Sequence, residues 1–255
     1  MKCLTVRSVI YKCLKEVEML MQRFKDWWVS HWKQVCTWTG IAFLAMVSLA
    51  LIFNQPIANW LLENQSGQVV KPNNQASYNY GQVKSLSSTD VLKARMRHHN
   101  YIGAIAMPDQ NMSTPIVEGV ANSDLAVGAG TLRPHMKMGK GNYALAGHNM
   151  DTTAPVLFSP LYQAFAKGPN TMNGQKIYVS DLKRVYVYRV DQSVEISPKS
   201  VNVINNTSRP ILTLITCNYT GSQRVMVRAS YQKSYPFGHA SARVRSMLTQ
   251  NVQDK

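Results

Sequence analysis

The chain has 255 residues, which is room for one folded domain and an anchor at about 100–200 residues per domain. Its 28 Lys and Arg outweigh its 13 Asp and Glu, giving a formal net charge of +15 at pH 7. We expect no nucleic-acid partner, because the positive residues are scattered and are not interleaved with aromatic residues in a stripe. Attraction to anionic polymers or lipid headgroups, or simple solvation, accounts for the charge instead.

Residues 36–53 form an uncharged apolar run, and no charged residue occurs between Lys33 and Glu63. As a helix this run would be roughly 27 Å long, close to the hydrocarbon thickness of about 30 Å, so it predicts a transmembrane anchor. A cleaved signal peptide fits less well, because the preceding segment is too long and no small-x-small cleavage site follows. Residues 1–35 contain seven Lys or Arg, whereas none follows the run until Lys71, which predicts a cytoplasmic N-terminus and an extracellular C-terminal part.

The segments on either side of this run differ in pattern. Residues 1–35 carry apolar residues at the spacing of one helix face: Ile10, Leu14, Val17, Met21, Phe24 and Trp28. This predicted amphipathic segment could lie along the inner leaflet, pair with another copy or continue the anchor helix. Residues 54–88 are rich in Asn, Gln and Ser and predict an extracellular spacer, after which a helix is expected over about 88–98.

From residue 101 onward the chain has the pattern of short strands separated by clusters of Gly, Pro and Asn. The predicted strands are 102–106, 115–120, 142–146, 175–179, 185–190, 211–216 and 224–230. Two segments, 123–126 and 156–165, are locally helical in pattern. Seven or eight strands with one or two short helices predict an all-β fold, a closed barrel, for the domain over 89–240. A polar, basic tail follows at 241–255.

Two of the predicted strands end near residues that can perform nucleophilic catalysis. The run 212–217 alternates as a half-buried strand does and ends in Cys217, and the strand 142–146 is followed by Gly147 and His148. A thiol and an imidazole fixed at strand ends are the minimum set for thiolate chemistry. In the predicted topology Cys217 is the only extracellular cysteine, so the outer part has no internal disulfide. An inert buried cysteine and a structural histidine are the alternatives.

These residues resemble the active-site signature of sortases, the cysteine transpeptidases that attach surface proteins to the Gram-positive cell wall. The resemblance rests on Leu-Ala-Gly-His at 145–148, Thr-Leu-Ile-Thr-Cys at 213–217, Arg224 and the run 125–131, and it extends over about 101–234. It implies the eight-stranded barrel of that family. Class A is the closer match, because the expected tail carries no second membrane span.

The resemblance also implies a role for each of three residues. Cys217 would attack a peptide carbonyl as the thiolate and form a thioacyl-enzyme, and His148 would protonate the departing amine. Arg224 would stabilise the oxyanion. Arg228 is the rival for that role, since even spacing puts both arginines on one face of a strand, but the resemblance favours Arg224. Asp151 could contact His148, although it fits better as a cap of the following helix.

By resemblance, the donor substrate is a secreted protein with a Leu-Pro-x-Thr-Gly sorting signal, cut between Thr and Gly, and the acceptor is the amine of a lipid-linked peptidoglycan precursor. The candidate substrate-binding residues are Thr216, Ala146, Val194, Ile196, Val201 and Val203. No cofactor or metal is expected, and the loop 132–140 has no carboxylate, which argues against the calcium site of some class A sortases. A cysteine peptidase that only hydrolyses and a non-catalytic wall-binding module are the alternative functions.

Overall fold

The computed structural model describes residues 3–52, 76–78, 93–94, 101–150, 156–250 and 252. The chain divides into two compact units, Met1–Asn54 and Gln55–Lys255. Of the predicted spacer and the helix that follows it, only 76–78 and the helical pair 93–94 belong to the described residues, and Asp151 lies outside them.

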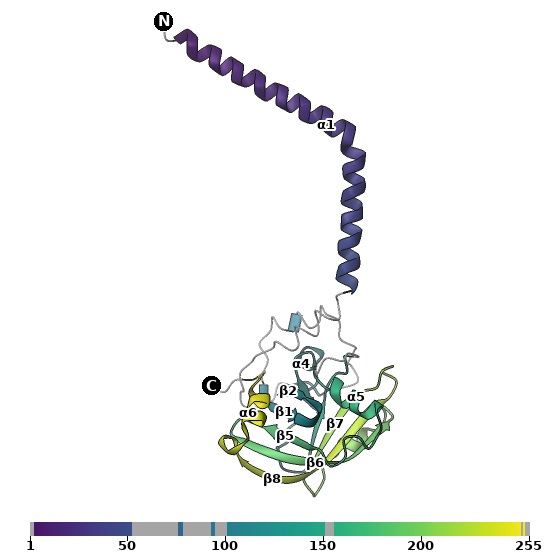
Figure 1. The fold of residues 1–255 in the computed structure, drawn as a ribbon. Helices are drawn as coiled ribbons and strands as arrows, with labels where there is room; N and C mark the ends of the chain where they lie inside the picture. The colour runs from purple at the N-terminus through teal and green to yellow at the C-terminus, as the bar shows by residue number, and fades with distance from the viewer. Residues whose placement is uncertain are drawn as a thin grey trace. The chain divides into compact units, whose positions relative to one another are not determined.

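The first unit is a single helix, α1 (Cys3–Ile52), of 50 residues (Figure 1). The amphipathic segment therefore continues into the uncharged run, which is one of the three arrangements that the sequence left open. Many of the helix's large apolar side chains are exposed, Phe24 by 64% and Leu44 by 65%. Within the described part of the chain, no helix combines the length and the apolar character needed to cross a membrane.

The second unit is built around a closed barrel of eight strands (Figure 1). The strands are β1 (Tyr101–Met107), β2 (Met112–Val117), β3 (Ala129–Thr131), β4 (Asn142–Ala146), β5 (Lys176–Ser180), β6 (Arg184–Ile196), β7 (Ile211–Cys217) and β8 (Arg224–Pro236). Around the barrel they follow the order β1-β2-β3-β4-β7-β8-β6-β5, and β5 closes onto β1. The β2/β3 and β4/β7 pairs are parallel and the other pairs antiparallel. The predicted closed barrel is confirmed, and its sheet is mixed.

A few helices accompany the barrel among the described residues: α4 (Asn122–Leu125), α5 (Ser159–Ala166), α6 (Ala242–Thr249), η2 (Pro108–Gln110), η3 (Val201–Ile204) and η4 (Phe237–His239). The first two correspond to the predicted helical segments. The segment interpreted as a polar tail contains α6, which buries Val244 and Leu248 and begins with Ser241 accepting a hydrogen bond from the N–H of Val244. The prediction of one or two helices was therefore too low.

Alternation along β7 and β8 separates the barrel interior from an outer face. Leu214 of β7 and Val225 of β8 belong to the main core, which fills the interior. The outer face is covered by a smaller apolar cluster of Val120, Leu125, Leu132, Ala144 and Ile204. Ile215 packs against this cluster from β7, and Cys217 shares its face two residues further on. The predicted nucleophile therefore lies on the outer face of the barrel, on the same side of β7 as this apolar cluster.

Candidate active site

Two parallel strands bring the predicted histidine and cysteine to the same edge of the barrel. β4 pairs with β7 in parallel, with Ala146 opposite Ile215. His148 follows β4 by two residues and Cys217 is the last residue of β7. A hydrogen bond of 3.0 Å from the N–H of Gly147 to the carbonyl of Ile215 extends the ladder up to the residue before His148. The imidazole and the thiol are therefore carried by neighbouring strand ends.

Gly147 has to be a glycine because the ring of Phe158 packs directly against it. A Cβ at position 147 would lie 2.6 Å from ring carbons of Phe158. Phe158 is fully buried, and its N–H donates to the carbonyl of His148 at 3.1 Å. The backbone that carries the imidazole is thus fastened to the core on one side and to β7 on the other.

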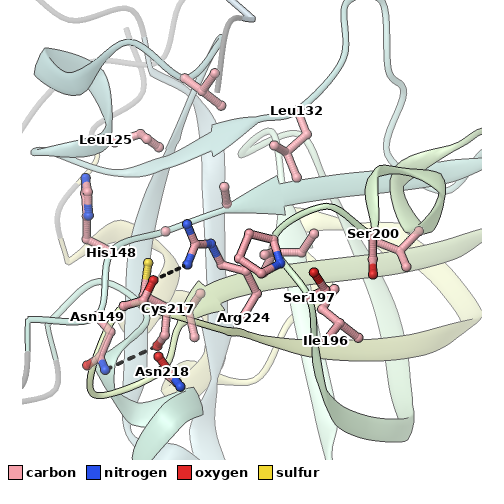
Figure 2. Close-up of a pocket in the computed structure, with 18 of the residues that line it drawn as sticks. Leu125, Leu132, His148, Asn149, Ile196, Ser197, Ser200, Cys217, Asn218 and Arg224 are labelled. Atoms are coloured by element: carbon pink, nitrogen blue, oxygen red, sulfur yellow. Dashed lines mark hydrogen bonds between the residues drawn. The ribbon is translucent and has the colours of Figure 1, made fainter. Parts of the chain in front are cut away.

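The β7/β8 hairpin places Arg224 directly opposite Cys217. Directly opposite residues of an antiparallel pair project from the same face, with Cβ atoms about 4.5–5.5 Å apart. Nη1 of Arg224 donates to the carbonyls of Gly221 at 2.8 Å and Gln223 at 3.1 Å, so the loop between the two strands holds the guanidinium. Figure 2 shows that guanidinium in the space beside Cys217.

Arg228, the rival arginine, has a different environment. It pairs with Thr213, which lies four residues before Cys217 on β7, so Arg228 is further from the thiol than Arg224 is. Its Nη2 contacts the sulfur of Met226 at 3.8 Å, and it is absent from the lining of the cavity that Arg224 enters. The register of the hairpin therefore distinguishes the two arginines, which alternation along the strand alone cannot do.

Cys217, His148 and Arg224 line one cavity of about 540 Å³. Leu125 and Leu132 contribute to an apolar wall of the same cavity (Figure 2). Of the predicted substrate-binding residues, the cavity lining includes Thr216, Ala146, Ile196, Val201 and Val203. It does not include Val194, which lies on β6 opposite Met226. A concave, largely apolar surface with a few convergent polar groups is typical of a ligand site.

The imidazole of His148 is buried and electrostatically disfavoured as a cation. Only 7% of the residue is exposed. Burial lowers the pKa of His148 and the nearby Arg224 guanidinium lowers it further, to about 4, so the resting imidazole is neutral at pH 7. Within the described residues, neither its Nε2 nor the buried Oγ1 of Thr216 has a hydrogen-bond partner. Both residues contribute to the lining of the cavity, so a ligand bound there would lie next to them.

Two asparagines that the sequence analysis did not single out organise this site. Nδ2 of Asn149 donates to the carbonyl of Cys217 at 3.3 Å, which joins the two strand ends directly. Asn218 accepts a hydrogen bond from the N–H of Gln223 at 3.2 Å and donates to Glu195 at 3.0 Å, so it shapes the loop that holds Arg224. Their only sequence signal is that each immediately follows a predicted catalytic residue.

The described residues show no cluster suited to a metal ion, since no three His, Cys, Asp or Glu side chains come together there. The loop between β3 and β4 carries Arg133, Lys137 and Lys140. Calcium requires several oxygen ligands, which these cationic side chains do not provide.

The chain matches the family model described as the sortase domain over residues 105–232. Sortase A of Streptococcus agalactiae serotype III is 34% identical over 222 residues, which cover 80% of this chain and 87% of that protein. Sortase A of Listeria monocytogenes serovar 1/2a is 32% identical over 188 residues, covering 69% and 81%. The solved structure of Listeria monocytogenes sortase A has a TM-score of 0.51 at 31% identity and covers 59% of this chain and 97% of that one. The chain belongs to the sortase family and is a sortase A-like cysteine transpeptidase.

Proposed function

We propose that this enzyme cleaves a Leu-Pro-x-Thr-Gly sorting signal between Thr and Gly and transfers the upstream protein to the amine of a lipid-linked peptidoglycan precursor. The observation that carries the proposal is that Cys217, His148 and Arg224 line a single cavity with an apolar wall. A thiol, an imidazole and a fixed cation are the groups that acyl transfer through a thioester uses. The membership of the sortase family supports the same reaction.

In the first half-reaction, the thiol of Cys217 gives its proton to the neutral His148, and the thiolate attacks the carbonyl carbon of the threonine. The oxyanion that forms lies where Arg224, opposite Cys217, can stabilise it. When the tetrahedral intermediate collapses, the carbon–nitrogen bond breaks and the imidazolium protonates the departing glycine amine. The products are a thioester on Cys217, a neutral His148 and the released C-terminal peptide.

In the second half-reaction, the precursor amine attacks the thioester carbonyl and loses a proton to the neutral His148. The carbon–sulfur bond then breaks, and the proton on the imidazole returns to the Cys217 sulfur. In each half-reaction, therefore, His148 first accepts a proton as a base and then donates it as an acid. Water in place of the amine would give hydrolysis by the same steps.

The low pKa of His148 determines when the imidazole is protonated during the reaction. In the resting site, burial and Arg224 both oppose the imidazolium. A thiolate at Cys217 adds a negative charge that favours it. The imidazolium is therefore expected only together with the thiolate or the oxyanion, that is, during turnover.

The residues proposed to contact the peptide differ in exposure. Thr216 is only 2% exposed, and its hydroxyl oxygen has no hydrogen-bond partner among the described residues. Val201, in contrast, is 51% exposed. We assign Thr216 and Ala146, beside the strand ends, to the threonine end of the signal. Ile196, Val201 and Val203 would form the apolar wall, and Val194 would act only through its neighbours on β6.

We further propose that residues 36–53 anchor the enzyme in the cytoplasmic membrane, with 1–35 inside the cell, 54–88 as a spacer and 89–240 as the extracellular catalytic domain. The support is the uncharged run and the excess of Lys and Arg on its N-terminal side. An outward-facing domain would meet both the secreted substrate and the lipid-linked acceptor.

The test uses the full chain in a non-ionic detergent and a quenched Leu-Pro-x-Thr-Gly peptide, with and without a glycine-type amine. The expected result is cleavage together with a product in which the amine is joined to threonine. Cys217→Ala should abolish cleavage. Cys36→Ala is the matched control, because Cys36 is a free, exposed cysteine on α1, and it should leave the rate unchanged.

Release of peptide at the same rate with and without the amine, and without an amine-linked product, would replace the transfer proposal with hydrolysis. Cleavage by Cys217→Ala would remove the thiol from the mechanism. If the folded enzyme does not cleave this peptide but cleaves another sorting signal, only the proposed substrate sequence would be wrong, and the transfer mechanism would stand.

A further inference from the structure

A second hollow, of about 180 Å³, includes the first residue of β4 in its lining and shares no lining residue with the catalytic cavity. It is lined by Arg133, Pro134, His135, Met136, Lys137, Lys140, Gly141, Asn142 and Asn206. All but the last come from the β3–β4 connection and the start of β4, and Asn206 comes from the β6–β7 connection. Two loops far apart in sequence therefore build this hollow together.

The charged side chains that line the hollow are all positive. Arg133, Lys137 and Lys140 contribute three positive charges, and no carboxylate is among the described residues that line it. The segment 132–140 contains no Asp or Glu at all. Like charges gathered on a concave surface repel one another and concentrate a positive potential there. An anion that enters the hollow relieves this repulsion.

The hollow also has a fixed inner part. Nη2 of Arg133 donates to the carbonyl of Asn142 at 2.8 Å, while its Nε is buried without a hydrogen-bond partner in the described part of the chain. Oδ1 of Asn206 accepts from the N–H of Asn142 at 3.2 Å, so the remaining polar end of that amide is its Nδ2 donor. Gly141 permits this contact, because a Cβ there would lie 2.0 Å from Oδ1 of Asn206.

We propose that this hollow binds a phosphoryl group, as a phosphate or diphosphate. A phosphate carries close to two negative charges and three strong acceptor oxygens, which match a guanidinium, two ammonium groups and an amide donor. A single carboxylate would leave more of the positive charge uncompensated. The group can belong to a soluble phosphate or to the headgroup of an anionic lipid.

The experiment titrates inorganic pyrophosphate into the full chain in dodecyl maltoside, at constant ionic strength, by isothermal calorimetry. Saturable binding is expected, and Lys137→Gln/Lys140→Gln should weaken it by about tenfold or more, since hydrogen bonds to charged groups are the strong ones. Lys167→Gln/Lys176→Gln is the matched control, because it removes the same charge from exposed lysines elsewhere on the unit and should change the affinity less than about twofold. Arg133→Gln tests the inner part of the hollow separately.

A second arm adds phosphatidylglycerol to the micelles, with phosphatidylcholine as its comparison. Displacement of pyrophosphate by phosphatidylglycerol alone would identify a lipid headgroup as the source of the phosphoryl group, and lack of displacement would identify a soluble phosphate. Either supports the site. Absence of pyrophosphate binding, or equal weakening by the two double variants, would overturn it, because the charge would then act diffusely and not at this hollow.

Discussion

At the scale of single residues, His148 couples the stability of the enzyme to pH. Its folded-state pKa is lowered to about 4 from the usual 6.5, first by burial and then by Arg224. Well above pH 6.5 this imidazole is neutral in both the folded and the unfolded chain. As the pH falls from 6.5 towards 4, the imidazole becomes protonated in the unfolded chain but stays neutral in the folded chain. The free energy of unfolding therefore decreases over this pH range.

We therefore expect the free energy of unfolding of the wild type, relative to His148→Asn, to fall by about 3 kcal/mol between pH 6.5 and pH 4. Urea unfolding curves at several pH values measure this difference. His239→Asn, which removes an exposed histidine, should show no comparable change relative to the wild type. A constant difference between the wild type and His148→Asn across the window would mean that His148 is not held neutral by the fold.

Arg224 and Arg228 provide a second test at this scale, because only Arg224 faces Cys217. Replacing a donor that stabilises an oxyanion costs about 10²–10³ in rate. Arg224→Gln should therefore lower kcat/KM for the quenched peptide by that factor, mostly through kcat. Arg228→Gln, which changes the same charge on the same face, should stay within about threefold of the wild type. If the two variants lost kcat/KM equally while their melting temperatures stayed unchanged, the stabilisation of the oxyanion would come from the positive charge of the whole face and not from Arg224 in particular.

The sequence was sufficient to place Cys217 and His148 at strand ends, because both follow runs with a clear strand pattern. It could not separate Arg224 from Arg228, since residues four apart share a face. The choice depends on the register of the β7/β8 hairpin, which pairs Cys217 with Arg224. That register is set by the turn at 218–223 and its side-chain hydrogen bonds, for which the sequence has no strong signal.

At the scale of elements, Asn142 ties β4 and β7 to the segment that walls the cavity. Its Nδ2 donates to the carbonyls of Val203 and Asn205, each at 3.0 Å, and its Oδ1 accepts from the hydroxyl of Thr213 at 2.8 Å. Asn142 is only 1% exposed, so these partners are satisfied by one buried side chain. η3 and the residues after it thus receive their position from the first residue of β4.

Asn142→Ala is expected to lower the free energy of unfolding by about 2–4 kcal/mol, because it removes three hydrogen bonds and leaves the buried hydroxyl of Thr213 without this partner. It should also raise KM for the sorting peptide more than it lowers kcat, because Val201 and Val203 line the cavity while the catalytic side chains come from the strand ends. Urea unfolding and peptide kinetics measure the two effects. Thr213→Val, which removes one hydrogen bond and keeps the shape, should cost about 1 kcal/mol. A loss of stability with an unchanged KM would limit Asn142 to a structural role.

The elements that the sequence did not reveal are those with too little pattern to show a period. β3 has three residues, one of them Gly130, and a strand this short has no measurable alternation. α6 buries only Val244 and Leu248, four positions apart, and its remaining residues include two Arg, one Ser and one Thr, so its composition resembles a tail. Both depend on the rest of the barrel: β3 bridges β2 and β4, and α6 packs against β1 and β2.

At the scale of the whole molecule, the proposed anchor within the N-terminal helix α1 would determine where the enzyme works. The sequence argument for an anchor depends on the uncharged run 36–53, because a single Arg near the middle of a membrane span costs about 2.5–3.5 kcal/mol. Two arginines within the run should therefore prevent stable insertion. We expect Leu44→Arg/Val47→Arg to move the enzyme from the membrane fraction to the soluble fraction of expressing cells, with the quenched-peptide activity of the solubilised protein retained.

The matched control is Val17→Arg/Leu20→Arg, which adds the same charges to exposed positions of the same helix before the run and should leave the enzyme in the membrane fraction. Protease added to intact protoplasts then reports the orientation: the second unit, Gln55–Lys255, should be digested while an N-terminal tag stays protected. A wild-type enzyme found in the soluble fraction, or a double arginine variant that stays in the membrane as well as its control does, would refute the anchor. Protection of the second unit would refute the orientation, and with it the expectation that the active site faces the secreted substrate and the lipid-linked acceptor.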